Sequence, residues 1–415
     1  MTARWWPALV ALVATGFLAL QLPLAPGRAT PDTTNYAAMA LTGLGTPYES
    51  VRAQAVEQRC ADGLRRERER RALDIAPAPG REPLDEWGVT GACEERVTAA
   101  LPVGLMGAPG GPAPTRCERI FQARPGYSWA VTPFVAALGL RWGMWTYALL
   151  VTVTGGVLAY ALLRVTGLAP PAALAGQLLY YALPTGSWSM RPLTEGTVLT
   201  LTLAVLLGVA LLLTGRTRLG PAVLAGATAA LFAVKYSAAT TTAAACAAGC
   251  ALLLLTGRAR RAPAALALTG SLALGCALGA RLLGWPGPLI SLMELFSDHC
   301  RGQDVPDPWQ RLFALNGPYW TAWWRTQATE PLGLLAWAAG AWGLLARPAR
   351  HPLGPVVLAV AATGLLTQAL HPDVLEGDRL HLALWLLPVL GLPRLLHRAR
   401  HPLGPAKVTP APLTG

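Results

Sequence analysis

The feature that most restricts the fold of this chain is a series of apolar stretches, each long enough to cross a lipid bilayer. A transmembrane helix needs about 20 consecutive, mainly apolar residues, and such stretches recur between residues 5 and 396. The chain of 415 residues is 53% hydrophobic and only 13% charged, with a mean hydropathy of +0.40. These values exclude a set of soluble domains, which the length alone would allow. The sequence therefore predicts an all-α polytopic membrane protein.

About ten transmembrane helices are expected, with both termini on the cytoplasmic side. The first apolar stretch is long for the core of a secretory signal peptide, which is the alternative interpretation, and further stretches follow it. The expected spans are 5–24, 142–163, 169–186, 195–213, 220–236, 238–255, 262–283, 331–346, 355–370 and 380–396.

The distribution of charge sets the expected orientation. The predicted inner loops and tails contain Arg or Lys, such as Arg164, Arg258 and Arg398, but no Asp or Glu. This asymmetry is typical of cytoplasmic loops. It also accounts for the net charge of +12, so membrane lipid is the expected partner and no nucleic acid is expected.

These assignments divide the chain into loops and membrane regions. The long loops are expected outside the cytoplasm, and the first of them is expected to contain one or two helices, including a charged surface helix over 48–74. A short apolar stretch at 129–140 predicts an interfacial or re-entrant helix. The regions are a first transmembrane helix (1–24), an extracytoplasmic loop subdomain (25–128), transmembrane helices (129–284), a second extracytoplasmic loop (285–330), transmembrane helices (331–396) and a cytoplasmic tail (397–415).

The cysteines fall into two groups. Cys60, Cys93, Cys117 and Cys300 lie in the predicted outer loops, where an oxidising compartment would allow two disulfides in any of three pairings. The other three lie within predicted spans, where buried thiols most simply act as small apolar side chains.

Several polar residues are expected at the outer rim of the helix bundle, where ionisable groups next to lipid often indicate function. An acid at this rim, such as Asp32, can simply end a hydrophobic helix, and Glu195 can simply complement a helix dipole. Lys235 can extend toward the interface or bind a phosphate. Arg379 can pair with Asp378 or Glu376, or bind a donor phosphate.

Four short motifs resemble segments of the GT-C type glycosyltransferases, which include protein O-mannosyltransferases and lipid A aminoarabinose transferases. Pro-Asp-Thr-Thr-Asn-Tyr-Ala (31–37) resembles the start of that family's first outer loop. The other motifs are Arg-Pro-Gly-Tyr-Ser-Trp (124–129), Met-Arg-Pro-Leu-Thr-Glu-Gly (190–196) and Asp-Arg (378–379), in the family's order. Thr33 stands where several relatives have a second acid.

The resemblance implies an enzyme that takes a sugar from a polyprenyl-phosphate donor, with Asp32 as the catalytic base. The expected substrate-binding residues are Tyr36, Arg124, Arg191, Glu195, Lys235 and Arg379. No cofactor or metal site is expected; a divalent metal requirement is left open, because the spacing of His371 and His381 does not demand one.

The sequence therefore favours a multi-pass glycosyltransferase of the plasma membrane with its active face outside the cytoplasm. Its acceptor would be a glycan, a lipid or a protein. A transporter or flippase, and a non-catalytic membrane assembly protein, are the alternatives. A transporter would require charged groups near the bilayer midplane and repeated halves, and neither is evident.

Overall fold

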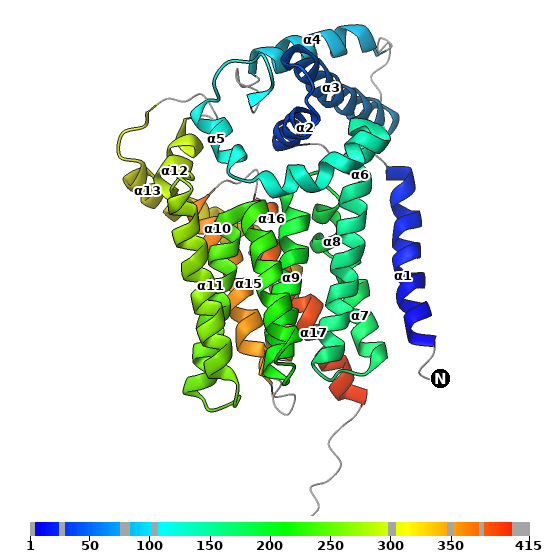
Figure 1. Ribbon diagram of the computed structural model, residues 1–415. Coiled ribbons are helices and arrows are strands. Elements are labelled where there is room, and N and C mark those ends of the chain that lie inside the picture. The colour runs from blue at the N-terminus through cyan, green and yellow to red at the C-terminus, as the bar shows by residue number, and fades with distance from the viewer. Residues whose placement is uncertain are drawn as a thin grey trace, which may run out of the picture.

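The computed structural model describes residues 5–24, 30–74, 84–100, 107–297, 304–346, 352–372 and 377–400. Within these ranges every regular element is a helix, which confirms the all-α class. Figure 1 shows upright helices packed side by side, with further helices lying across one end. We call α2 (Pro31–Gly43), α3 (Tyr48–Ala72), α4 (Glu86–Ala100) and α5 (Arg116–Gln122), which lie at that end, the cap.

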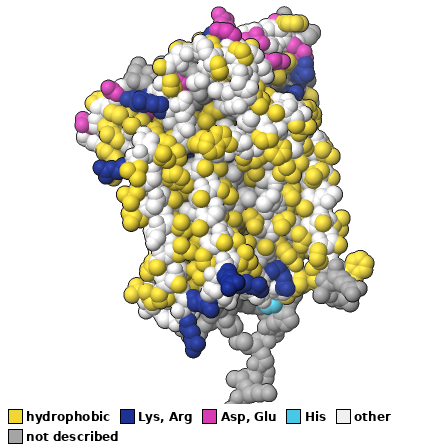
Figure 2. All heavy atoms as spheres, in the orientation of Figure 1, with side chains coloured by type: hydrophobic (Ala, Val, Ile, Leu, Met, Phe, Trp, Pro, Cys, Tyr) yellow, Lys and Arg dark blue, Asp and Glu magenta, His cyan; other side chains and the backbone are white. Residues whose placement is uncertain are grey.

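Among the residues that the structure describes, four helices are long and apolar enough to cross a membrane: α6 (Pro125–Val165), α9 (Thr194–Leu213), α10 (Leu219–Leu255) and α11 (Ala262–Leu282). Shorter apolar helices stand beside them, among them α1 (Trp6–Gln21), α14 (Leu332–Leu345) and α15 (Gly354–Leu370). On the face shown in Figure 2, the flank of the bundle is largely hydrophobic; acidic side chains gather at the cap end, and Lys and Arg side chains lie at both ends. The molecule is thus built as a membrane protein, while ten spans and their orientation remain predictions.

Helix α10 reverses direction at Lys235, whose backbone is extended (φ −161°, ψ 88°). Gly215, just before α10, lies beside the guanidinium of Arg261, just after it, so the two ends of α10 are close together. Gly208 of α9 packs on Leu224 in the first half of α10. The separate helices expected at 220–236 and 238–255 are therefore both present, joined by a sharp turn that places Lys235 beneath the cap.

Helix α6 bends at Gly139, which has φ 75°. A Cβ on Gly143 would lie 2.5 Å from the backbone nitrogen of Val135, so the two arms fold closely together. Only glycine adopts this left-handed backbone without strain. The first arm, which includes the short helix expected at 129–140, crosses beneath the cap, and the second arm runs down the bundle (Figure 1).

The cap contains more helices than the one or two expected: α2 (Pro31–Gly43), α3 (Tyr48–Ala72), α4 (Glu86–Ala100) and α5 (Arg116–Gln122). Its small side chains pack tightly, because Ala37, Ala38 and Leu41 of α2 are buried in one cluster with Val131 and Val135 of α6. The cap therefore shares a core with the bundle, which the low apolar content of this region did not indicate.

A disulfide joins Cys60 of α3 to Cys93 of α4, selecting one of the open pairings. Cys117 is also disulfide-bonded, whereas Cys300 lies outside the described residues. The three cysteines within the bundle are buried free thiols, as expected.

Other expected helices are interrupted. Pro184 separates α7 (Pro170–Ala182) from α8 (Pro184–Ser189), and the stretch expected at 380–396 begins with α16 (Gly377–Leu380) and the 3₁₀ turn η4 (Leu382–Trp385) before α17 (Leu386–Arg400). The first span ends in the 3₁₀ turn η2 (Leu22–Leu24), and the second long loop contains α12 (Pro288–Phe296) and α13 (Pro308–Thr329). α1 begins, and α17 ends, at the end of the bundle away from the cap (Figure 1).

Candidate active site

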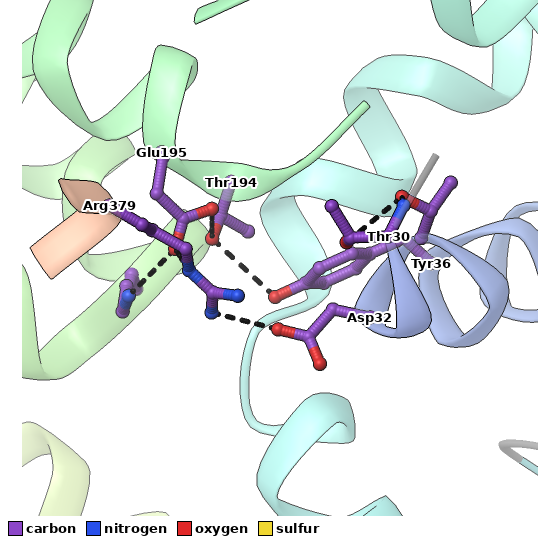
Figure 3. Close-up of polar contacts among 8 residues, drawn as sticks. Thr30, Asp32, Tyr36, Thr194, Glu195 and Arg379 are labelled. Atoms are coloured by element: carbon purple, nitrogen blue, oxygen red, sulfur yellow. Dashed lines mark hydrogen bonds and ion pairs between the residues drawn. The ribbon is translucent and has the colours of Figure 1, made fainter. Parts of the chain in front are cut away.

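Four charged side chains from four separate segments meet where the cap joins the bundle (Figure 3). Nη2 of Arg379 donates a hydrogen bond of 2.8 Å to Oδ2 of Asp32, and Nε of Arg379 donates one of 2.9 Å to Oε1 of Glu195. Nζ of Lys235 lies 3.5 Å from the same Glu195 oxygen. We call Asp32, Glu195, Lys235 and Arg379 the junction cluster.

Local structure presents each acid of the junction cluster at the start of a helix. Thr30 and Thr33 form a reciprocal capping box at the beginning of α2, which fixes Asp32 in its first turn. Glu195 lies in the first turn of α9. Both acids also complement the positive end of a helix dipole. Glu195 is more than a dipole cap, however, because two cations bind it.

The members of the junction cluster differ in exposure. The side chains of Glu195, Arg379 and Lys235 are 8%, 14% and 20% exposed, whereas that of Asp32 is 30% exposed. Buried charges are costly unless they are paired, and the first three satisfy one another. Among the described residues, Oδ1 of Asp32 accepts no hydrogen bond, so this carboxylate retains an oxygen for another partner.

Tyr36 and Arg124 extend the junction cluster. The Tyr36 hydroxyl donates to Oγ1 of Thr194 at 3.5 Å, and that hydroxyl donates to Oε2 of Glu195 at 3.4 Å. Burial raises the pKa of Tyr36 despite the nearby Arg124 guanidinium, so this side chain remains a neutral phenol at physiological pH.

Arg124 supplies a third cation. Burial lowers its pKa, but Tyr36 and Asp32 act in the opposite direction and the net result is a raised pKa. Its Nε is buried and has no hydrogen-bond partner among the described residues. Three cationic side chains thus face two carboxylates, and this excess positive charge suits an anion such as a phosphate.

The structure brings together six of the seven residues proposed from the sequence: Asp32, Tyr36, Arg124, Glu195, Lys235 and Arg379. The seventh, Arg191, has its guanidinium 3.6 Å from the centroid of the Trp188 ring, and its role in substrate binding stays a prediction. Neither local partner considered for Arg379 is seen, because Glu376 and the Asp378 side chain lie outside the described part of the structure.

Thr194 and Tyr127 are parts of the site that the sequence analysis did not identify. Thr194 links Tyr36 to Glu195, and the Tyr127 ring lies 4.8 Å from the Tyr36 ring. The Tyr127 hydroxyl is buried with no hydrogen-bond partner in the described ranges. Thr194 lies in the same motif as Glu195 (190–196), and Tyr127 lies in the same motif as Arg124 (124–129). Membership of these motifs was the sequence signal that could have identified both residues.

An aromatic cluster borders the junction cluster on the Arg379 side. The His381 ring lies 5.6 Å from Trp323 and 6.2 Å from Trp337, and Trp337 contacts Trp385 at 5.5 Å. Tryptophan concentrates where a protein meets the interface of a bilayer. These rings therefore form an apolar surface that includes His381, which is two residues along the chain from Arg379.

The described residues contain no group of three or more His, Cys, Asp and Glu side chains that could hold a metal ion. Comparison of the chain with protein-family models, with curated proteins and with solved structures finds no match. The geometry of the site therefore carries the functional argument.

Proposed function

We propose that this protein is an integral membrane glycosyltransferase that moves a sugar from a polyprenyl-phosphate donor to an acceptor outside the cytoplasm. Asp32 is the general base. The observation that carries the proposal is the Asp32 carboxylate, which is 30% exposed and has one oxygen unused among the described residues, beside three cations at one end of a bundle of apolar helices.

The reaction needs one proton transfer and one displacement. The acceptor hydroxyl gives its proton to Oδ1 of Asp32 while its oxygen bonds to the anomeric carbon of the donor sugar. The bond between that carbon and the phosphate oxygen breaks, and the polyprenyl phosphate leaves with the electron pair. Arg379, Lys235 and Arg124 oppose the negative charge that develops on the leaving phosphate.

The two hydrogen bonds of Arg379 suggest how donor binding prepares the base. Nη2 binds Asp32 and Nε binds Glu195, so a phosphate that takes the Nη2 donor releases Asp32 while Glu195 keeps the guanidinium in position. In this proposal Arg379 neutralises the Asp32 carboxylate in the resting protein, and donor binding removes that cation from Oδ2 while Oδ1 stays open to the acceptor hydroxyl.

The surroundings fit a lipid-linked donor. The apolar flank of the bundle would lie in the plasma membrane, and the wall formed by Trp323, Trp337 and Trp385 offers a surface for a polyprenyl chain. The cap would lie outside the cytoplasm, and the opposite end, whose loops carry Arg but no Asp or Glu, would lie inside.

Sugar transfer by purified protein in liposomes tests the proposal, with polyprenyl-phosphate mannose and polyprenyl-phosphate aminoarabinose as donors. Asp32→Asn should lower the rate by at least about a hundredfold, in the range that a positioned base contributes. Glu57→Gln, an exposed carboxylate of α3 changed in the same way, should leave the rate unaltered. Full activity of Asp32→Asn would contradict the proposed mechanism, and sugar accumulation in sealed vesicles without transfer would indicate a transporter.

A further inference from the structure

A second site lies beside the junction cluster, in a cavity of about 250 Å³ between α5 and the turn that joins α11 to α12. Ligand pockets are commonly about 300–1,000 Å³, so this cavity suits one small ring rather than a long chain. Its lining residues include Arg116, Arg119, Gln122, Trp285, Pro286 and Ile290.

The two walls of the cavity differ in character. Arg116, Arg119 and Gln122 are three residues apart along α5 and so lie on one side of that helix. Trp285, Pro286 and Ile290 form an apolar wall. The Trp285 ring is held in place by stacking on Phe232, with ring centroids 4.9 Å apart.

The two arginines of this cavity are in different electrostatic situations. Arg116 forms ion pairs with Glu294 and, at 2.6 Å, with Asp304. None of the ion pairs or hydrogen bonds among the described residues involves the side chain of Arg119, which is exposed. The cavity therefore has one arginine neutralised by two acids and one whose guanidinium is available.

A ligand that matches both walls has an apolar face and a negative charge. The C–H face of a pyranose ring packs on an indole, and a carboxylate on the same ring can accept two parallel hydrogen bonds from a guanidinium. Gln122 adds an amide that can donate to or accept from sugar hydroxyls. This combination favours a saccharide that carries a carboxylate.

The cavity walls adjoin the chain segments that carry two cations of the candidate active site. Ala123 lines the cavity, and the next residue is Arg124. On the opposite wall, the Pro286 carbonyl accepts a hydrogen bond from the hydroxyl of Tyr236, which follows Lys235. The Tyr236 ring also contacts Trp285, at 5.1 Å between centroids. The cavity walls therefore include chain segments that directly adjoin Arg124 and Lys235.

We infer that this cavity is the acceptor subsite and that it binds a carboxylate-bearing saccharide through Arg119 and Trp285. The assignment of the ligand as an acceptor rests on the proposed function. Binding of the saccharide does not, because the cavity and its charge exist whether or not Asp32 catalyses transfer.

Calorimetric titration of the full-length protein in detergent tests the inference, with methyl glucuronide and methyl glucoside as the probes. Wild type should bind the glucuronide at least about tenfold more tightly than the glucoside, and Arg119→Gln should remove most of that difference. Arg311→Gln, another exposed arginine, outside the cavity lining, serves as the matched control and should bind as wild type does.

The results that would contradict this subsite differ from those that would contradict the proposed function. Equal glucuronide binding by wild type and Arg119→Gln would overturn the subsite. Phosphatidylglycerol supplied in nanodiscs gives a second test. If this lipid blocks glucuronide binding and its own binding depends on Arg119, the subsite is also overturned, because the cavity would then bind a lipid headgroup. Loss of transfer in Asp32→Asn with unaltered glucuronide binding supports both proposals, and Arg119-dependent binding by a protein that never transfers sugar would retain only the subsite.

Discussion

Two sets of carboxylate–guanidinium pairs in this molecule have similar hydrogen-bond lengths but different surroundings. On the outside of the cap, Arg68 of α3 binds Glu86 of α4 at 2.6 Å. In the junction cluster, Arg379 binds Asp32 at 2.8 Å. The side chains of Arg68 and Glu86 are 54% and 46% exposed, whereas that of Arg379 is 14% exposed and those of its partners Asp32 and Glu195 are 30% and 8% exposed.

The difference shows that water, rather than bond length, decides what such a pair contributes. Water and salt compete with exposed pairs, which therefore add little to stability. A buried pair gains little from being formed but is costly to break, because one charge is then left without a partner. The surface pairs also join near neighbours in sequence, whereas Asp32 and Arg379 are 347 positions apart, so the junction cluster holds distant segments in one arrangement.

The largest effect is expected for Arg379→Gln. It leaves Asp32 without the cation that binds it and Glu195 with Lys235 alone, which should lower the free energy of unfolding by about 3–5 kcal/mol and abolish sugar transfer. Arg68→Gln, the same change on the cap surface, should leave both quantities nearly unaltered. Chemical unfolding in detergent measures the comparison, and equal losses for the two variants would remove the distinction between the two sets of pairs.

The next largest effect is expected from removing the disulfide that joins α3 to α4. If surface pairs add little, the Cys60–Cys93 disulfide, which spans 33 residues, is the stronger link. Replacing both cysteines with serine should then destabilise the cap by about 2–4 kcal/mol. Hydrogen exchange of the α3 and α4 amides reports this loss. Unchanged protection would mean that the exposed ion pairs suffice by themselves.

Within the junction cluster, the two acids should differ. Glu195→Gln leaves Arg379 and Lys235 sharing a neutral partner in a buried position, and should reduce stability by about 2 kcal/mol more than Asp32→Asn. Asp32→Asn should instead have the larger effect on sugar transfer. Measuring unfolding and initial rates on both variants separates the two roles, and the reverse order in either measurement would contradict them.

The smallest expected effect is a change in the stability of α3, on the surface of the cap, as the pH is lowered. Hydrogen bonds from Arg70 and Arg71 lower the pKa of Glu67 to about 2, from an ordinary 4.5. A lowered pKa in the folded state means that the contribution of Glu67 is complete above about 4.5 and is lost as the pH falls toward about 2. The helical content of α3 should decrease slightly across this window, and Glu67→Gln should remove that dependence in circular dichroism.

Much of the fold follows from patterns within a short stretch of chain. Apolar stretches predict helices because a bilayer leaves the backbone no other way to satisfy its hydrogen bonds. The polar Lys235 between two apolar stretches correctly separates the two halves of α10. The cap was underestimated because α2 buries small side chains such as Ala37 and Ala38, and packing of small residues leaves a weak hydrophobic signal.

The contacts within the candidate active site are harder to predict from sequence patterns. The motifs identified most of the residues of the site, but they did not indicate which of these residues bind one another. Arg379 has acids beside it in sequence, yet it binds Asp32 and Glu195, because the packing of α2, α9 and α16 sets these distances. The same packing places Thr194 between Tyr36 and Glu195. Contacts of this kind depend on the whole fold and leave no local pattern.

The most direct test of the reaction centre is the single-turnover rate of sugar transfer by Asp32→Asn with saturating polyprenyl-phosphate sugar in liposomes. Our account predicts that the variant still binds the donor, because Arg379, Lys235 and Arg124 are intact, but transfers the sugar at least about a hundred times more slowly than wild type. A rate within about twofold of wild type would show that Asp32 is only a structural partner of Arg379 and would contradict the account.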